Sequence, residues 1–367
     1  MLKQYKLRDY RFRLILWIIL LSVLGIMIIG SADKDIQNKQ IAGLVMGLIV
    51  MIIVSLIDYV WLLKFYWIFY FTGMALLVAV HFVGVEAGGA TRWLNLGFTQ
   101  LQPSDVMKIV LIMFFAQFFS VHEDDLSTFK TIIKAVIIAA VPCYLILKQP
   151  NLSTCLLTMI LFCAIYFAAG LSYKIIAGII AVVAPLIVIL VGIILKPGQT
   201  LIQEYQLLRI LAWLYPDQYP DQAAQQVNSI IAIGSGQLYG KGLETTAVES
   251  VKNGNFLAEA QTDFIFAVAG EELGFLGCCI IIILEILIVL ECIWIGKNAR
   301  EFSGTLICCG MGALIGIQSI MNICVATGLM PNTGLPLPFV SAGLTSLMTL
   351  FIGVGLVLNV GLQVKKY

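Results

Sequence analysis

The sequence contains few charged residues. Only 12% of its 367 residues are Asp, Glu, Lys or Arg, which is about half the share in an average soluble domain. The 22 basic and 21 acidic residues almost cancel and leave a net charge of +1, so the chain has no basic field to attract a polyanion. This composition excludes a soluble enzyme, a disordered chain and a nucleic-acid-binding protein.

The sequence is also poor in residues that hold metals or act in covalent catalysis. Its two histidines, His81 and His122, have no metal-ligand partner nearby in the sequence, which excludes a zinc site or a His-based triad. All nine cysteines lie inside apolar runs, and none forms a CxxC pair. We therefore expect the cysteines to act as small packing residues rather than as disulfides or metal ligands.

Long hydrophobic runs dominate what remains, since 60% of the chain is hydrophobic. A membrane-spanning helix needs about 20 mostly apolar residues. Ten runs reach or approach that length: 14–30, 41–57, 65–84, 106–121, 132–147, 152–170, 175–195, 264–296, 303–327 and 339–364. The sequence predicts an all-α polytopic membrane protein with about ten transmembrane helices, the first of them a membrane helix rather than a cleaved signal peptide.

The distribution of Lys and Arg predicts the orientation. The short loops on the same side as the two termini hold more of these residues, which favours two cytoplasmic termini. Two longer segments, 85–105 and 196–263, then lie outside, the second as one large extracellular loop between helices 7 and 8. Within it, 201–215 is apolar but interrupted by polar residues, as in an interfacial or re-entrant helix. We expect residues 1–367 to form a single integral membrane domain.

Asp263 is the last residue of the large loop and lies at the outer end of the eighth run. Two interpretations are open. Thr262 or Asp263 caps the following helix, where the helix dipole favours an acid. Alternatively, Asp263 is a general base at the membrane face that acts on an amphiphilic substrate.

Three cations near the outer face suggest anion binding. Arg92 beside Trp93 is either an interfacial anchor or a bidentate phosphate ligand. Lys108 follows a helix start at Pro103-Ser104 by about one turn, and we expect it to face a polar cavity or the lipid headgroups. Lys241 lies in the glycine-rich segment 234–242, which lacks the spacing of a nucleotide-binding P-loop but offers backbone N–H groups to a phosphate.

Four ordered motifs resemble those of the SEDS family (shape, elongation, division and sporulation), which includes RodA, FtsW and SpoVE. They are Arg92-Trp93 through Gln102-Pro103-Ser104-Asp105, Ala232-Ile233-Gly234-Ser235-Gly236 through Gly240-Lys241-Gly242, Thr262-Asp263-Phe264-Ile265-Phe266-Ala267 through Gly270-Glu271-Glu272-Leu273-Gly274, and Thr333-Gly334-Leu335-Pro336-Leu337-Pro338-Phe339-Val340-Ser341. The resemblance covers nearly the whole chain, and the overall size is more similar to RodA than to FtsW. The sequence departs from the family pattern at Asn151, Gln261, Ala342 and Leu344.

The resemblance implies an inverting peptidoglycan glycosyltransferase for cell elongation and shape, in the bacterial cytoplasmic membrane. Such an enzyme polymerises lipid II, a disaccharide-peptide on undecaprenyl pyrophosphate, into β-1,4 glycan strands at the outer face. It implies Asp263 as the catalytic base. With the residue patterns above, it predicts substrate binding by Arg92, Trp93, Gln102, Ser104, Lys108, Lys241, Glu259, Thr262 and Ser341.

The resemblance also implies partners. These are a class B penicillin-binding protein that acts as transpeptidase, together with membrane lipids. A divalent cation, Mg²⁺ or Mn²⁺, is an open alternative for part of the charge on the pyrophosphate. Two other functions remain open: a transporter that flips lipid II across the membrane, and a non-catalytic scaffold for the penicillin-binding protein.

Overall fold

The computed structural model describes residues 10–87, 90–95, 97, 100–173, 175, 177–178, 192, 203–243, 257 and 260–363. Within them, eight helices are long and apolar enough to cross a membrane: α1 (Phe12–Ala32), α2 (Lys34–Leu56), α4 (Tyr66–Val83), α5 (Pro103–Val121), α6 (Phe129–Lys148), α11 (Ile265–Lys297), α12 (Phe302–Ala326) and α13 (Leu344–Leu362). A further apolar helix, α7 (Leu152–Ala168), is shorter. The chain is therefore a multi-pass helical membrane protein, as expected, although the predicted run 175–195 lies almost entirely outside the described residues.

The last predicted run differs most from the structure. We expected it to begin at residue 339, but α13 begins at Leu344. Pro336 and Pro338 disfavour a helix in the preceding segment, and Phe339 and Gly343 have positive φ angles of 59° and 157°. Residues 335–343 therefore form a loop at the outer end of the bundle. The third predicted run, 65–84, corresponds to α4, and a short helix that was not predicted, α3 (Tyr59–Leu63), precedes it.

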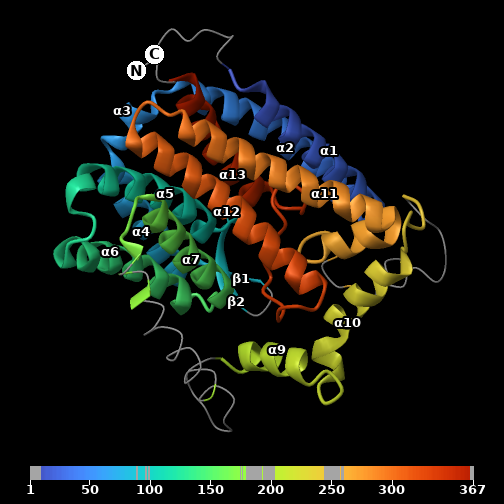
Figure 1. Cartoon of the computed structure of the whole chain (residues 1–367). Coiled ribbons are helices and arrows are strands. Elements are labelled where there is room, and N and C mark those ends of the chain that lie inside the picture. The colour runs from blue at the N-terminus through green and yellow to red at the C-terminus, as the bar shows by residue number, and fades with distance from the viewer. Residues whose placement is uncertain are drawn as a thin grey trace.

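The helices form two groups that lie side by side (Figure 1). Helices α1, α2, α11, α12 and α13 run together, and α4 to α7 pack against them through α5 and α12. A short 3-10 helix, η2 (Glu123–Asp125), joins α5 to α6. Close approach holds α2 against α13: a Cβ added at Gly47 would lie 2.1 Å from Cδ2 of Phe351, and one at Gly355 would lie 2.8 Å from the carbonyl oxygen of Met51. Small residues allow such contact between membrane helices.

Helix α5 lies at the centre of the molecule. It packs against α4, α7, α12 and α13, and its side chains are buried along most of its length. By contrast, α2 and α4 expose large apolar side chains such as Ile49, Ile53, Ile68 and Phe71, which suits helices that face lipid. A polar group on α5 is therefore shielded from both lipid and water.

The first external segment contains a small antiparallel sheet, which adds β structure to the predicted all-helical fold. Strand β1 (Val85–Ala87) pairs with β2 (Ala90–Asn95), and β2 pairs with β3 (Gln100–Leu101). The sheet ends directly before α5 and carries Arg92 and Trp93 on its middle strand. It thus fixes both residues close to the outer end of α5.

The long segment 196–263, which we expect to be external, contributes two more helices, α9 (Glu204–Leu214) and α10 (Pro220–Ser235). The interfacial helix expected over 201–215 is thus confirmed as a helix. Both lie at the end of the bundle opposite the start of α1 and the end of α13 (Figure 1). At that other end, Arg11 lies next to Gly361, so the start of α1 and the end of α13 lie together.

Helix α11 is broken near its outer end. Gly274 has φ 66° and ψ −164°, a conformation that glycine adopts readily. Residues 237–242 fit against the break, where the amide of Lys241 donates to the carbonyl of Glu271 and the amide of Phe275 donates to the carbonyl of Gln237. The first two turns of α11 are therefore tied to α10 and the segment that follows it.

Candidate functional site

Asp263 lies immediately before α11 at the outer end of the bundle. Phe264 occupies the N-cap position of α11, so neither Thr262 nor Asp263, the two predicted caps, holds that position. The backbone of this segment is held firmly by its neighbours. Asn322 of α12 donates 2.8 Å to the carbonyl of Asp263, and Ser341 donates 2.6 Å to the carbonyl of Thr262.

The proline-containing loop 335–343 supports this segment from behind. The side chain of Asn322 also donates to the carbonyl of Leu335, at 2.7 Å. The amide of Ala342 donates to the carbonyl of Gln261, at 2.9 Å, and the amide of Leu337 donates to Oγ of Ser341, at 2.7 Å. Asp263 is thus placed by a hydrogen-bonded backbone rather than by a freely moving loop.

Arg209 of α9 lies close to Asp263. The two side chains flank Gly334: a Cβ built there would lie 3.4 Å from Oδ2 of Asp263 and 3.8 Å from Nη1 of Arg209. Gly334 also has a positive φ of 66°, which favours glycine. The absence of a side chain at residue 334 therefore keeps the space between acid and cation open.

The electrostatics of Arg209 reflect this position. Partial burial lowers the pKa of its guanidinium, the Asp263 carboxylate acts in the opposite direction, and Arg92 lowers the pKa further. Within the described residues, the Arg209 guanidinium makes no hydrogen bond, although it lies over the Tyr205 ring at 5.7 Å from the centroid. Its donors are thus available to an anion.

Unlike Arg209, Arg92 uses its guanidinium in several hydrogen bonds to the protein. Its Nη2 donates to the carbonyl of Pro150 at 2.5 Å and to the Tyr205 hydroxyl at 2.8 Å, and its Nε donates to the carbonyl of Gln149 at 3.3 Å. The Tyr205 hydroxyl itself donates to the carbonyl of Pro150. Arg92 therefore joins the β sheet to α9 and to the turn before α7.

A cleft separates these groups. Its polar lining consists of Arg92, Arg209, Tyr205, Asn332 and Thr333, with other polar groups. Apolar side chains complete the wall: Leu152, Leu156, Ile210 and Met330. A cleft with two guanidinium groups and an apolar side suits an amphiphilic anion.

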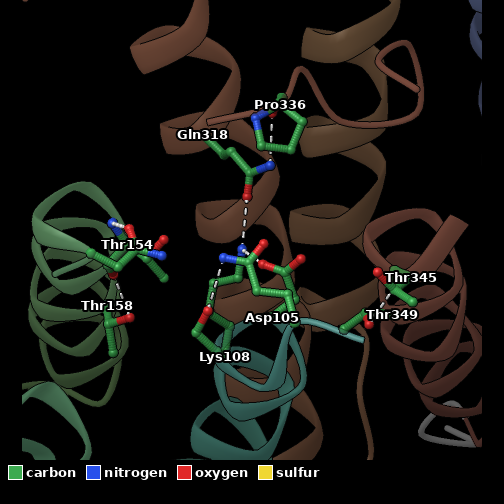
Figure 2. Close-up of polar contacts among 11 residues, drawn as sticks. Asp105, Lys108, Thr154, Thr158, Gln318, Pro336, Thr345 and Thr349 are labelled. Atoms are coloured by element: carbon green, nitrogen blue, oxygen red, sulfur yellow. Dashed lines mark hydrogen bonds and ion pairs between the residues drawn. The ribbon is translucent and has the colours of Figure 1, made fainter. Parts of the chain in front are cut away.

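Lys108 is placed differently from the prediction of a polar cavity or headgroup contact. It is only 4% exposed, and its Nζ lies 2.9 Å from Oδ1 of Asp105 and 3.2 Å from Oε1 of Gln318. Figure 2 shows Lys108 pointing from α5 toward Gln318, which in turn donates to the carbonyl of Pro336 at 2.8 Å. Lys108 is thus engaged inside the bundle, beneath the loop that supports Asp263.

Lys241 likewise forms its ion pair with a residue other than Asp263. Its Nζ is 2.8 Å from Oε1 of the fully buried Glu271, which belongs to the part of α11 beside the Gly274 break. Neighbouring Glu272 accepts a hydrogen bond from Ser31 at the end of α1. This second polar cluster links α1, α11 and the segment after α10.

The other predicted binding residues are scattered. Trp93 is half-buried on β2, and Gln102 precedes α5, where its amide donates to the hydroxyl of the fully buried Ser104 at 3.1 Å. Glu259 lies outside the described residues. The structure therefore brings Thr262 and Ser341 to Asp263, and Arg92 to the neighbouring cleft, but not Lys108 or Lys241.

A metal site was left open by the sequence. The described part of the chain contains no group of three or more His, Cys, Asp or Glu side chains that could hold a metal ion. The divalent cation stays a prediction.

Sequence reasoning missed Arg209, Tyr205 and Asn322. Arg209 is the one cation within the apolar stretch 201–215, a pattern that was noted only as evidence against a membrane span. Tyr205 precedes it by four residues, so the two share a helix face. Asn322 is a polar residue inside an apolar span, and that type of residue often marks a functional region.

Comparison with known proteins identifies the family. Residues 11–366 match the FTSW_RODA_SPOVE family model, which is described as "Cell cycle protein". The chain is 33% identical over 334 residues to peptidoglycan glycosyltransferase MrdB of Escherichia coli K12, a match that covers 90% of this chain and 87% of that protein. It is 31% identical over 356 residues to the probable peptidoglycan glycosyltransferase FtsW of Trichlorobacter lovleyi, which covers 93% and 90% of the two chains.

Solved structures share the fold. One chain from a peptidoglycan synthase complex that coordinates polymerization and crosslinking aligns with a TM-score of 0.81 at 26% identity, over 96% of this chain and 97% of that one. The Rod shape determining protein RodA of Thermus thermophilus aligns with a TM-score of 0.70 at 24% identity, over 96% of both chains. With a family model that spans almost its whole length, the chain belongs to the FtsW/RodA/SpoVE family.

Proposed function

We propose that this protein is an inverting peptidoglycan glycosyltransferase that polymerises lipid II into β-1,4 glycan strands for cell elongation and shape. Membership of the family and the names of the relatives support the activity, and the helical bundle places it in the bacterial cytoplasmic membrane. One observation carries the assignment of residues: Asp263 and Arg209 face each other across Gly334, beside a cleft that also contains Arg92.

Asp263 acts as the general base. The 4-hydroxyl of the acceptor sugar attacks the anomeric carbon of the donor, its proton passes to the Asp263 carboxylate, and the bond between that carbon and the pyrophosphate oxygen breaks. Such a base must lie within about 3 Å of the hydroxyl that it deprotonates. The backbone bonds to Asn322 and Ser341 supply the required rigidity, since misplacement of a catalytic group is costly.

Arg209 and Arg92 neutralise the leaving pyrophosphate. Negative charge develops on that group as the bond breaks, and fixed cations in a partly buried cleft stabilise it. Arg209 contributes the available donors, whereas Arg92 adds charge and holds the wall of the cleft through Pro150 and Tyr205. Lys108 and Lys241, which the sequence also favoured, already have Asp105 and Glu271 as partners.

The prenyl chain leaves the cleft along α7. Leu152 and Leu156 line the cleft, and both are exposed on the surface of the bundle, at 38% and 42%. An undecaprenyl carrier needs an apolar path from the diphosphate site to the lipid-facing surface, because its long prenyl chain is stable only when its apolar surface is kept away from water.

A partner completes the proposal. A structural neighbour belongs to a peptidoglycan synthase complex, and crosslinking of glycan strands requires a transpeptidase. We propose a class B penicillin-binding protein as that partner for this chain.

The function is tested with the purified full-length protein in detergent and fluorescent lipid II. We expect products longer than one disaccharide, separated by gel electrophoresis and degraded by a muramidase. Transport cannot be observed without a bilayer, so polymer formed in detergent distinguishes a transferase from a flippase. Failure to form polymer, both alone and with the candidate transpeptidase, would refute the proposed activity.

A further inference from the structure

A second cleft lies between the two external helices, on the other side of Arg209. Its volume is about 400 Å³, and α9 and α10 form its walls. This volume is within the range of roughly 300–1,000 Å³ that is typical of small-molecule sites. The cleft shares Tyr205, Arg209 and Asn332 with the cleft described above, so the two are contiguous.

The helical spacing of the sequence explains the lining of this second cleft. On α9, Tyr205, Leu208, Arg209 and Ala212 lie on one face because they are three or four residues apart. On α10, the lining residues are Asp221, Gln222, Gln225 and Gln226, which recur with the same period. One wall is thus partly apolar, and the other is lined almost entirely by amide and carboxylate groups.

Some of these polar side chains make hydrogen bonds that hold the cleft in place, and others can make hydrogen bonds to a ligand. Gln226 donates to the carbonyls of Val325 and Met330 at 2.9 Å and 2.6 Å, which anchors α10 to the end of α12. The Nδ2 of Asn332 donates a hydrogen bond to Oε1 of Gln225 at 3.5 Å. Among the described residues, the Gln222 side chain and the Nε2 of Gln225 have no hydrogen-bond partner, so both can serve a ligand.

We infer that the cleft between α9 and α10 binds the glycan strand, as a saccharide subsite next to the reaction centre. This inference rests on the proposed function. Amides both donate and accept hydrogen bonds, as required for ring hydroxyls and N-acetyl groups, and the Tyr205 ring with Leu208 supplies an apolar surface for a sugar face. Arg209 is the one cation among the described residues that line the cleft, which favours a neutral polyhydroxylated ligand over a second phosphate.

The position of the subsite gives it a role in elongation. A strand that occupies it has one end at Arg209 and Asp263, with the diphosphate in the neighbouring cleft. Contacts to sugars beyond the reacting unit hold a growing strand between successive additions. The first coupling of two lipid II molecules, by contrast, involves no strand long enough to fill the cleft.

The test compares Gln222→Ala/Gln225→Ala with Gln218→Ala. Gln218 is an exposed glutamine in the turn between α9 and α10, and it does not line the cleft. Binding of a peptide-free, uncrosslinked glycan tetrasaccharide, with its lactyl carboxylates amidated so that the probe is neutral, to each detergent-purified protein is measured by saturation-transfer NMR. We expect the double variant to bind about tenfold more weakly, from the loss of one or two hydrogen bonds, and Gln218→Ala to bind like the wild type.

The same proteins are then assayed with lipid II. The double variant should form the first coupled product at the wild-type rate but yield shorter strands. Tetrasaccharide binding and strand lengths that both equal those of the wild type would overturn the subsite, as would binding of the isolated stem peptide in place of the sugar. A wild type that binds the tetrasaccharide without polymerising lipid II would refute the proposed function and leave the saccharide site standing.

Discussion

The protein contains two acid–cation pairs of similar composition in contrasting surroundings. Asp105 and Lys108 lie one turn apart on the central helix α5, almost fully buried and in direct contact at 2.9 Å. Arg209 comes from α9 and Asp263 from the segment before α11, and the two side chains stand apart on either side of Gly334. The first pair is surrounded by protein, whereas Arg209 of the second pair lines two clefts.

The difference separates a structural role from a chemical one. In the first pair each charge has its partner, and Gln318 accepts a further hydrogen bond from Lys108. Few hydrogen-bond donors of Lys108 therefore remain for a substrate. In the second, the Arg209 guanidinium has no hydrogen bond to described residues, and a ligand can complete it. The segments around Asp105 and Asp263 both resemble motifs of the family, so a motif alone does not distinguish these roles.

The largest expected effect on stability comes from breaking the buried pair. Lys108→Met leaves the Asp105 carboxylate buried without its cation, and such a change costs about 3–5 kcal/mol. Thermal unfolding in detergent should show a marked loss. The matched control is Asp105→Leu/Lys108→Met, which removes both charges and should regain most of the stability. A double variant that is stable but unable to polymerise lipid II would assign Lys108 to the chemistry instead.

The next effect concerns Arg209. Arg209→Gln removes a charged donor from the substrate, which is worth about 1.5–3 kcal/mol, so kcat/KM for lipid II should fall roughly 10- to 150-fold. The melting temperature should change little, because the described residues offer this guanidinium no hydrogen bond. An equal loss of stability and activity would instead indicate a structural role like that of Lys108.

A smaller effect on activity is expected at Ser341. Ser341→Ala removes the bond to the carbonyl of Thr262 and leaves the amide of Leu337 without its acceptor. Each buried polar group left unsatisfied costs about 1–3 kcal/mol. We expect moderate destabilisation with a lower kcat and a nearly unchanged KM, because Asp263 is less well positioned. Ser341→Cys, which retains a weak donor and acceptor, should recover part of the rate.

The smallest expected effect tests the space between the two side chains. Gly334→Ala places a methyl group in contact with Asp263 and Arg209 and adds backbone strain of about 1 kcal/mol. Gly170→Ala adds similar strain at φ 95° with no atom within 4 Å of the new Cβ. Both variants should lose similar stability, but only Gly334→Ala should lose activity. Equal activities would show that the space around Gly334 is not used.

The sequence predicted most membrane helices because hydrophobic run length directly reflects bilayer thickness. The helix start at Pro103 and the interfacial helix at 201–215 also followed from local signals. The break at Gly274 did not, since it depends on residues 237–242 packing into α11 from a different part of the chain. Asn151 was identified as a departure from the family pattern, and its side chain accepts from the amide of Thr154 at the start of α7, a role that Asn and Asp perform equally well.

The partners of the cations could not be predicted from the local sequence. The spacing of Asp105 and Lys108 on one helix allowed a pair, but their burial results from the position of α5 among four other helices. Arg209 and Asp263 both lie beside Gly334 although they are far apart in sequence, and no periodicity in the sequence encodes that proximity. The local sequence therefore predicted the position of Asp263 before α11 better than it predicted the partners of the cations.

The most direct test of the central claim is the activity of Asp263→Asn in detergent with lipid II. The amide has nearly the same size and cannot take the proton of the acceptor hydroxyl. We predict an intact melting temperature, unchanged binding of lipid II and no detectable polymer. Glycan strands formed by this variant at a rate near that of the wild type would contradict the assignment of Asp263 as the base.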